Sequence, residues 1–153
     1  MNRFFTVPGE PQGKGRPRFI KGRAYTPPKT KAYEERVRSC YTRACGSEPP
    51  YPAGVPLSVI INADFPVPES TPKKNIPQML SGEILPTKKP DCDNIIKVIL
   101  DSLNGIAYHD DSQVVRVHCN KFYGTEAKVE VAIGRYKEVY DDEENSDVDQ
   151  VHV

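Results

Sequence analysis

An amphipathic segment near residue 100 restricts the possible folds more than any other feature of the sequence. From about residue 94 to 104, apolar residues recur at helical spacing, and Gly105 follows as a stop signal. The apolar residues are Ile95, Ile96, Ile99, Leu100 and Leu103. A helix with one apolar stripe must bury that stripe, and β-rich runs on both sides of it in the sequence offer a surface. We therefore expect helices packed on a sheet.

The other elements are predicted from β-rich runs and a second helical stripe. Strands are expected at residues 4–7, 55–65, 113–123 and 126–136. A helix is expected after Thr26, an N-cap candidate before Pro27, and it should end at Gly46. The order β-α-β-α-β-β predicts a single α+β domain, with a mixed β-sheet and helices packed on it.

Two segments fall outside this order. Residues 19–25 are compatible with a small hairpin around Lys21 and Gly22. Residues 66–90 contain six prolines and four lysines without clear periodicity. Connections of this length are usually functional or disordered.

The charge is distributed unevenly along the chain, although its formal sum is zero. Residues 1–137 carry a net charge of +7, which suits a polyanionic partner such as nucleic acid. Residues 138–153 contain seven acidic residues and neither Lys nor Arg. We therefore expect a domain over residues 1–137 and a disordered acidic tail over 138–153. The tail would compete with DNA for the basic surface or, alternatively, only aid solubility.

Other features of the sequence bear on cellular location. No run approaches the ~20 apolar residues of a membrane span, and no signal sequence is evident, so we expect a cytoplasmic protein without membrane contact. The four cysteines are too sparse for a disulfide framework and are expected to be reduced. Their spacing is also poor for a zinc site.

The segment Lys88-Lys89-Pro90-Asp91-Cys92-Asp93-Asn94-Ile95-Ile96-Lys97 is the most informative for chemistry. Asp91 and Asp93 can converge only if Asp91 is extended, and Pro90 followed by a helix start favours that arrangement. Asp93 or Asn94 would then cap the helix, and Lys97 would lie one turn on, beside Asp93. The simpler alternative is that Asp93 only caps the helix and Asp91 is solvated.

A second acidic pair, Asp110 and Asp111, precedes the strand predicted near Gln113. An 11-residue helix spans only ~16 Å, so the chain could return this pair toward Asp91. Carboxylates gathered in one cleft would repel one another, and oxygen ligands of this kind suit Mg²⁺, with Mn²⁺ as a possible substitute. A metal ion is the simplest neutralising group.

These residues resemble the RusA family of Holliday junction resolvases. Its core pattern, D-x-D-N-h-x-K, D-x-L and D-D-x-Q-V, matches segments that begin at Asp91, Asp101 and Asp110. The start of the chain, residues 11–18, is similar to the phage-type branch of that family. The resemblance implies a homodimeric, magnesium-dependent endonuclease that resolves four-way DNA junctions by paired symmetric nicks in recombination and repair.

By motif position, the resemblance also implies which residues are essential. The family's three aspartates fall on Asp91, Asp93 and Asp111, which would hold the metal, and its lysine falls on Lys97. Tyr108 and His109 depart from the residues that often precede the acidic pair, which leaves the choice between Asp110 and Asp111 open.

The chemistry of phosphodiester hydrolysis fits these residue types. Lys97 would orient the scissile phosphate or stabilise charge on it, or would only form a surface ion pair with Asp93. Flanking phosphates would be contacted by Lys14, Arg16, Arg18, Lys88 and Lys89. Two rival functions are a non-catalytic module that binds branched DNA and a glycosyltransferase that uses Asp-x-Asp. The second lacks a βαβ nucleotide-binding pattern.

Overall fold

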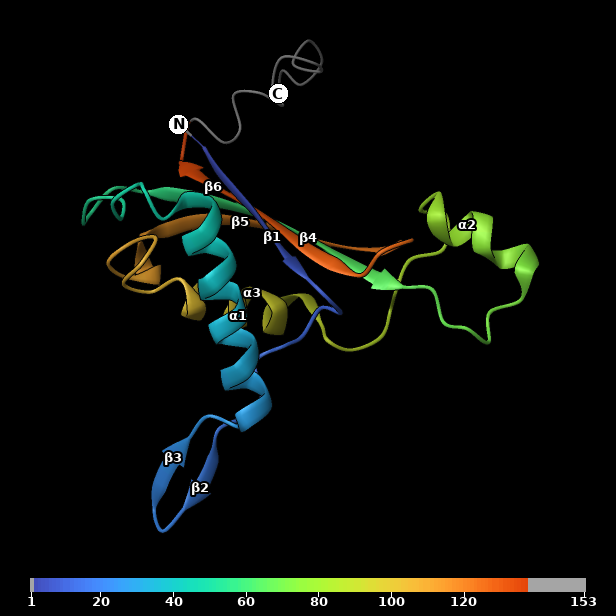
Figure 1. The fold of residues 1–153 in the computed structure, drawn as a ribbon, viewed down its shortest axis with the longest axis horizontal. Coiled ribbons are helices and arrows are strands. Elements are labelled where there is room, and N and C mark those ends of the chain that lie inside the picture. Colours follow the sequence, from blue (N-terminus) through green and yellow to red (C-terminus); the bar gives the residue numbers. More distant parts are fainter. Residues whose placement is uncertain (1, 138–153) are drawn as a thin grey trace, which may run out of the picture.

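The computed structural model describes residues 2–137, so the acidic tail expected over residues 138–153 lies outside the described residues. A four-stranded sheet of order β1-β6-β4-β5 packs against two helices, and a two-stranded hairpin projects beyond them (Figure 1). The strands are β1 (Arg3–Pro8), β2 (Arg18–Ile20), β3 (Arg23–Tyr25), β4 (Leu57–Pro66), β5 (Val114–Gly124) and β6 (Lys128–Arg135). The α-helices are α1 (Pro28–Cys45), α2 (Ile76–Leu80) and α3 (Cys92–Ser102), with 3-10 turns η1 (Lys73–Asn75) and η2 (Asp111–Gln113).

The predicted α+β class and element order are confirmed. The sheet strands and long helices follow as β1, α1, β4, α3, β5 and β6, and the hairpin around Lys21 and Gly22 is formed by β2 and β3. The structure adds η1 and the short helix α2 within residues 66–90. A five-residue helix with proline in its first turn is too short to give a periodic signal.

Helix boundaries differ slightly from the predicted ones. Pro27, rather than Thr26, occupies the N-cap position of α1, without a side-chain cap. Helix α3 begins at Cys92, two residues before the predicted start at Asn94. Among residues 2–137, no helix is long and apolar enough to cross a membrane.

Strand β4 separates two strands that are neighbours in sequence. It pairs in parallel with β5 and antiparallel with β6, whose other edge pairs with β1. The parallel connection from β4 to β5 contains α3, which therefore packs across one face of the sheet. This crossover fixes the start of α3 near one end of the sheet and its end near η2.

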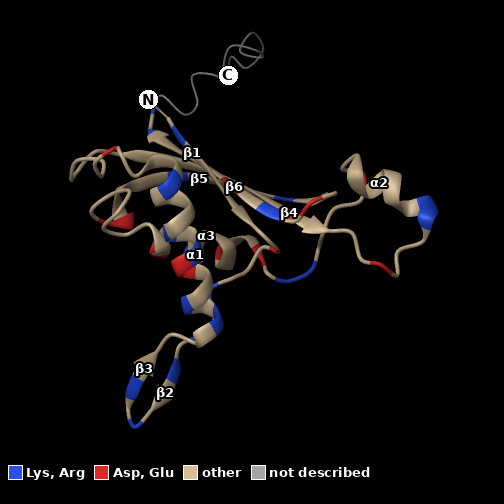
Figure 2. Ribbon diagram, viewed as in Figure 1, with Lys and Arg blue, Asp and Glu red and all other residues tan. Residues whose placement is uncertain are grey.

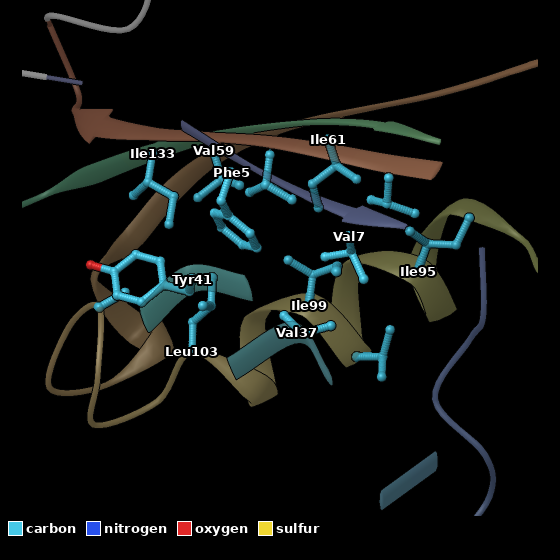
Figure 3. Close-up of a cluster of buried hydrophobic side chains, with 14 of the residues drawn as sticks. Phe5, Val7, Val37, Tyr41, Val59, Ile61, Ile95, Ile99, Leu103 and Ile133 are labelled. Carbon is cyan, nitrogen blue, oxygen red and sulfur yellow. The ribbon is translucent and has the colours of Figure 1, made fainter. Parts of the chain in front are cut away.

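The hydrophobic core lies between the sheet and the two long helices. Figure 3 shows Val37 and Tyr41 of α1 and Ile95 and Ile99 of α3 packed beneath the strands, where all four are buried. The predicted α3 stripe is confirmed at Ile95, Ile99 and Leu103, which are fully buried. Ile96 and Leu100 are only partly buried, and Val98, which the prediction did not include, is fully buried. The Tyr41 ring lies edge-on to Phe5 of β1, with centroids 5.5 Å apart. Each buried side chain of this size stabilises the fold by about 1.5–3 kcal/mol, which holds α3 rigidly on the sheet.

The two long helices, α1 and α3, lie on the same side of the sheet and leave its opposite face bare (Figure 1). A groove of about 360 Å³ on this face is lined by residues that include Phe4, Ile60 and Ala132. The Phe4 side chain is 65% exposed and Phe122 is 40% exposed. This bare face is mixed in character, since Asn62 and Asn120 form a hydrogen bond across it at 3.0 Å.

Candidate active site

Asp91 occupies the N-cap position of α3 in an extended conformation, as its place after Pro90 predicted. Its Oδ1 accepts a hydrogen bond from Asn94 Nδ2 at 2.6 Å, which lowers the pKa of Asp91. Cys92 points toward the sheet, where its thiol lies 3.7 Å from the carbonyl oxygen of Cys119. Asp93 lies exposed in the first turn. The prediction that Asp93 or Asn94 caps the helix was therefore wrong, because Asp91 takes the cap position.

Lys97 forms its ion pair with Asp101 rather than with Asp93. Lys97 Nζ lies 3.4 Å from Asp101 Oδ2, one turn further along α3. In residues 2–137 the structure contains no ion pair between Lys97 and Asp93. The carboxyl groups of Asp91 and Asp93 do meet, as predicted. The predicted place of Lys97 beside Asp93 was wrong, because Lys97 contacts a carboxylate on its C-terminal side.

The adjacent aspartates of η2 have different surroundings. Asp110 accepts a hydrogen bond from the Ser112 backbone at 3.1 Å and caps η2, and that bond lowers the pKa of Asp110. Asp111 contacts Asp101, and its backbone N–H donates to Asn104 Oδ1 at 2.9 Å. Burial, together with the charges of Asp110 and Asp101, raises the pKa of Asp111. Of the two aspartates, Asp111 is therefore the one that contacts α3, through Asp101.

The donors of this region suit a hard divalent cation, because Mg²⁺ and Mn²⁺ prefer carboxylate oxygens. The carboxyl groups contact one another in two pairs, Asp91 with Asp93 and Asp101 with Asp111. Nowhere in residues 2–137 are three His, Cys, Asp or Glu side chains grouped so that they could hold one ion. Joint binding of one ion by Asp91, Asp93 and Asp111 therefore requires these groups to approach one another.

The basic N-terminal loop lies against the start of α3. Lys14 N–H donates to the carbonyl oxygen of Asn94 at 3.1 Å, and Gly15 N–H donates to Thr30 Oγ1 at 3.0 Å. A Cβ on Gly13 would lie 3.0 Å from the Asn94 side chain, and one on Gly15 would lie 2.5 Å from Thr30 Oγ1. The glycines thus permit close packing of the loop on α3 and α1.

An open groove of about 820 Å³ runs between this loop and the start of α3. Its lining includes Arg16, Arg18, Lys89 and Asp91. Figure 2 shows basic residues along the β2–β3 hairpin, and residues 11–33 contain no Asp or Glu. The groove therefore connects this basic segment, residues 11–33, which we call the basic arm, to Asp91 at the N-cap of α3.

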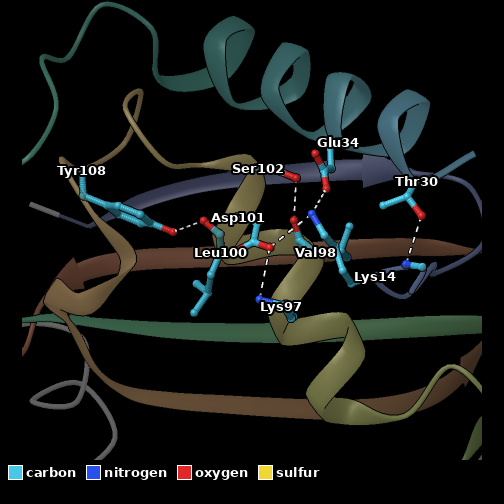
Figure 4. A network of polar contacts seen from close by, with 10 residues as sticks. Lys14, Thr30, Glu34, Lys97, Val98, Leu100, Asp101, Ser102 and Tyr108 are labelled. Atoms are coloured by element: carbon cyan, nitrogen blue, oxygen red, sulfur yellow. Dashed lines mark hydrogen bonds and ion pairs between the residues drawn. The ribbon is translucent and has the colours of Figure 1, made fainter. Parts of the chain in front are cut away.

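The basic residues expected to contact DNA are not equivalent. Arg16, Arg18, Lys88 and Lys89 are exposed, as a phosphate contact requires. The Lys14 side chain is only 18% exposed and pairs with Glu34 of α1 and with Asp101, 3.2 Å away (Figure 4). Glu34 and Asp101 were not predicted as site residues. For Asp101 two signals were available, namely its i,i+4 spacing from Lys97 and its place at the start of the D-x-L segment.

A stability measurement can separate the roles of Asp110 and Asp111. We expect Asp111→Asn to raise the melting temperature in EDTA, because it removes one charge from a repelling group. Asp110→Ala should instead lower the free energy of unfolding by about 1 kcal/mol through loss of a cap. Thermal and urea denaturation at neutral pH measure both effects. Destabilisation by Asp111→Asn would show that its carboxylate has a compensating partner.

Comparisons with known proteins agree with the sequence motifs. The family model described as Endodeoxyribonuclease RusA matches residues 8–134. The chain is also similar to the uncharacterized protein YqaN of Bacillus subtilis (strain 168), with 38% identity over 135 residues. That alignment covers 84% of this chain and 93% of YqaN.

Proposed function

The chain belongs to the RusA family of endodeoxyribonucleases, and from that membership we propose that it resolves four-way DNA junctions by paired symmetric nicks. The observation that carries the proposal is the group of charged residues along α3. Asp93, Lys97 and Asp101 follow one another at i,i+4 spacing, and Asp111 joins Asp101 from η2. A basic groove for a DNA backbone begins beside Asp91.

Hydrolysis of a phosphodiester needs an activated water and stabilisation of the leaving oxygen. Asp91, Asp93 and Asp111 would hold Mg²⁺, or Mn²⁺ in its place, and the ion would supply both effects. The Lys97 side chain is 62% exposed and extends from the same helix, so its ammonium can reach a phosphate lying along α3. Lys97 would stabilise charge that develops on the phosphate oxygens.

Paired nicks in a symmetric junction require two active sites related by a two-fold axis, which is why we propose a homodimer. The bare face of the sheet, with Phe4 and Phe122 exposed, is a suitable self-complementary surface. Sedimentation equilibrium should then give twice the 17.2 kDa mass of one chain. A monomer at micromolar concentration would contradict this part of the proposal.

The direct test is incubation with a synthetic four-way junction, labelled on each strand in turn, with Mg²⁺ or with EDTA. The proposed function requires symmetric nicks on opposite strands that depend on Mg²⁺. Junction binding without nicks would instead support the non-catalytic branched-DNA module. Neither binding nor nicking would exclude both functions.

The basic arm provides a separate prediction about DNA binding. Arg16→Ala and Arg18→Ala should each weaken junction binding and reduce the slope of log Kd against log salt by about 1, as expected for one lost phosphate contact. Fluorescence anisotropy across a salt series measures this slope. Arg43→Ala is the control. Arg43 lies in the last turn of α1, whereas the loop that carries Arg16 and Arg18 precedes the first turn of that helix. An equal effect of Arg43→Ala would mean that only net charge matters.

A further inference from the structure

Asp101 is shared by two lysines that come from different parts of the chain. Its Oδ2 lies 3.2 Å from Lys14 Nζ of the N-terminal loop and 3.4 Å from Lys97 Nζ of the same helix. Figure 4 shows both ammonium groups directed at this one carboxylate. The attraction of Asp101 is therefore divided between two cations.

The two lysines differ in burial and in their other contacts. The side chain of Lys14 is 18% exposed and also contacts Glu34, whereas that of Lys97 is 62% exposed. Burial acts to lower the pKa of Lys14, but its bonds to Glu34 and Asp101 outweigh burial and raise the pKa. Lys14 is thus a charged, anchored group, and Lys97 is the cation that can move.

The backbone around Lys14 is also held in place. Its own N–H bonds to Asn94 of α3, and the next N–H bonds to Thr30 of α1. To contact DNA, Lys14 would have to leave two carboxylates in a partly buried site, which is unfavourable. The ammonium is therefore poorly placed for the phosphate contact expected from the sequence.

We propose that Lys14 is a positioning residue that keeps Lys97 available to the scissile phosphate by neutralising Asp101. The inference rests on the proposed nuclease function. Among the ion pairs of residues 2–137, loss of Lys14 would leave Lys97 as the one ammonium partner of Asp101. Asp101 would then hold Lys97 more strongly, because the two ammonium groups repel each other when both are present. Lys97 would then be held along α3, away from DNA.

The decisive test is a double substitution. Lys14→Met removes the charge and retains an aliphatic side chain in the partly buried site. We expect it to lower the single-turnover rate constant on a four-way junction by about tenfold, since misplacing a reacting group costs up to ~10²-fold. Junction affinity, measured in EDTA, should change little. Asp101→Asn in the Lys14→Met background should restore the rate to that of Asp101→Asn alone, because Asn cannot hold Lys97 by charge.

Two further variants control for charge and for folding. Lys31→Ala removes an exposed positive charge from α1 and should leave the rate constant at the wild-type value. Lys14→Arg can pair with both carboxylates and should retain most of the activity. A wild-type rate in Lys14→Met, a parallel fall in affinity, or a slow rate that Asp101→Asn does not restore would each overturn the inference.

A measurement without DNA separates this inference from the proposed function. NMR relaxation of the Lys97 side chain should show a more restricted ammonium in Lys14→Met and a mobile one again when Asp101→Asn is added. If the wild type leaves junctions intact, the nuclease proposal fails, and this measurement still decides the linkage of Lys14 to Lys97. Unchanged Lys97 mobility in Lys14→Met would overturn it.

Discussion

Substitution of Asp91, Asp93 or Asp111 by Asn is expected to abolish nicking of a four-way junction while leaving junction binding intact or tighter. Each substitution removes an oxygen donor for the proposed metal ion and a negative charge that repels phosphate. We expect the single-turnover rate constant in Mg²⁺ to fall by more than ~10²-fold, because loss of even an indirect partner of a metal ligand costs up to that factor. Gel-shift titration in EDTA measures binding without cleavage.

Asp110→Asn is the matched control, because it makes the same chemical change one residue from Asp111. Asn is also an effective cap, so η2 should be retained. Its rate should stay near that of the wild type, since the Asp110 carboxylate bonds to Ser112 in its own turn. If Asp110→Asn were inactive and Asp111→Asn active, the assignment within the pair would be reversed.

The buried side of α3 and the extended Asp91 could be predicted because each depends on local sequence. A stripe of apolar residues at helical spacing has one stable solution, which is burial. The extended conformation of Asp91 follows from its place just before the first residue of a helix, since an N-cap residue has non-helical backbone angles. Neither prediction needed information about distant residues.

The partner of Lys97 could not be predicted in the same way. Asp93 and Asp101 are both four residues from Lys97, and local preference favours the acid on the N-terminal side, Asp93. The choice of Asp101 appears only in the tertiary structure, where Lys14 and Asp111 meet at the same carboxylate. The partners of Lys14 could not be predicted either. Its glycine-rich basic loop suggested phosphate contacts, and its two acidic partners, Glu34 and Asp101, are remote in sequence.

The strand order was beyond sequence reasoning for a related reason. Strands β5 and β6 are joined by a short turn, and sequential strands usually pair. The insertion of β4 between them is determined by how the α3 crossover returns the chain to the sheet. The alternation of apolar and polar residues within a strand indicates which face is buried, but it does not identify the neighbouring strand.

Lys97→Ala is expected to reduce the rate of cleavage much more than the affinity for the junction. The ammonium would interact most strongly when charge builds up on the reacting phosphate, so its loss acts mainly on the transition state. We expect the single-turnover rate constant to fall by about 10²–10³-fold, as for removal of one stabilising donor. Cleavage at saturating protein and anisotropy in EDTA measure the two effects separately.

Lys89→Ala should have the opposite effect, because Lys89 lines the groove and forms none of the ion pairs found within residues 2–137. It should weaken binding and leave the saturated rate constant nearly unchanged.

Equal losses of rate and affinity in Lys97→Ala would make Lys97 an ordinary phosphate contact. A large loss of rate alone would distinguish it from a surface ion pair, because removal of an exposed i,i+4 partner costs only about 0.3–0.5 kcal/mol of stability and no catalysis. The existing pair with Asp101 would then be the resting position of a lysine that leaves it when DNA binds.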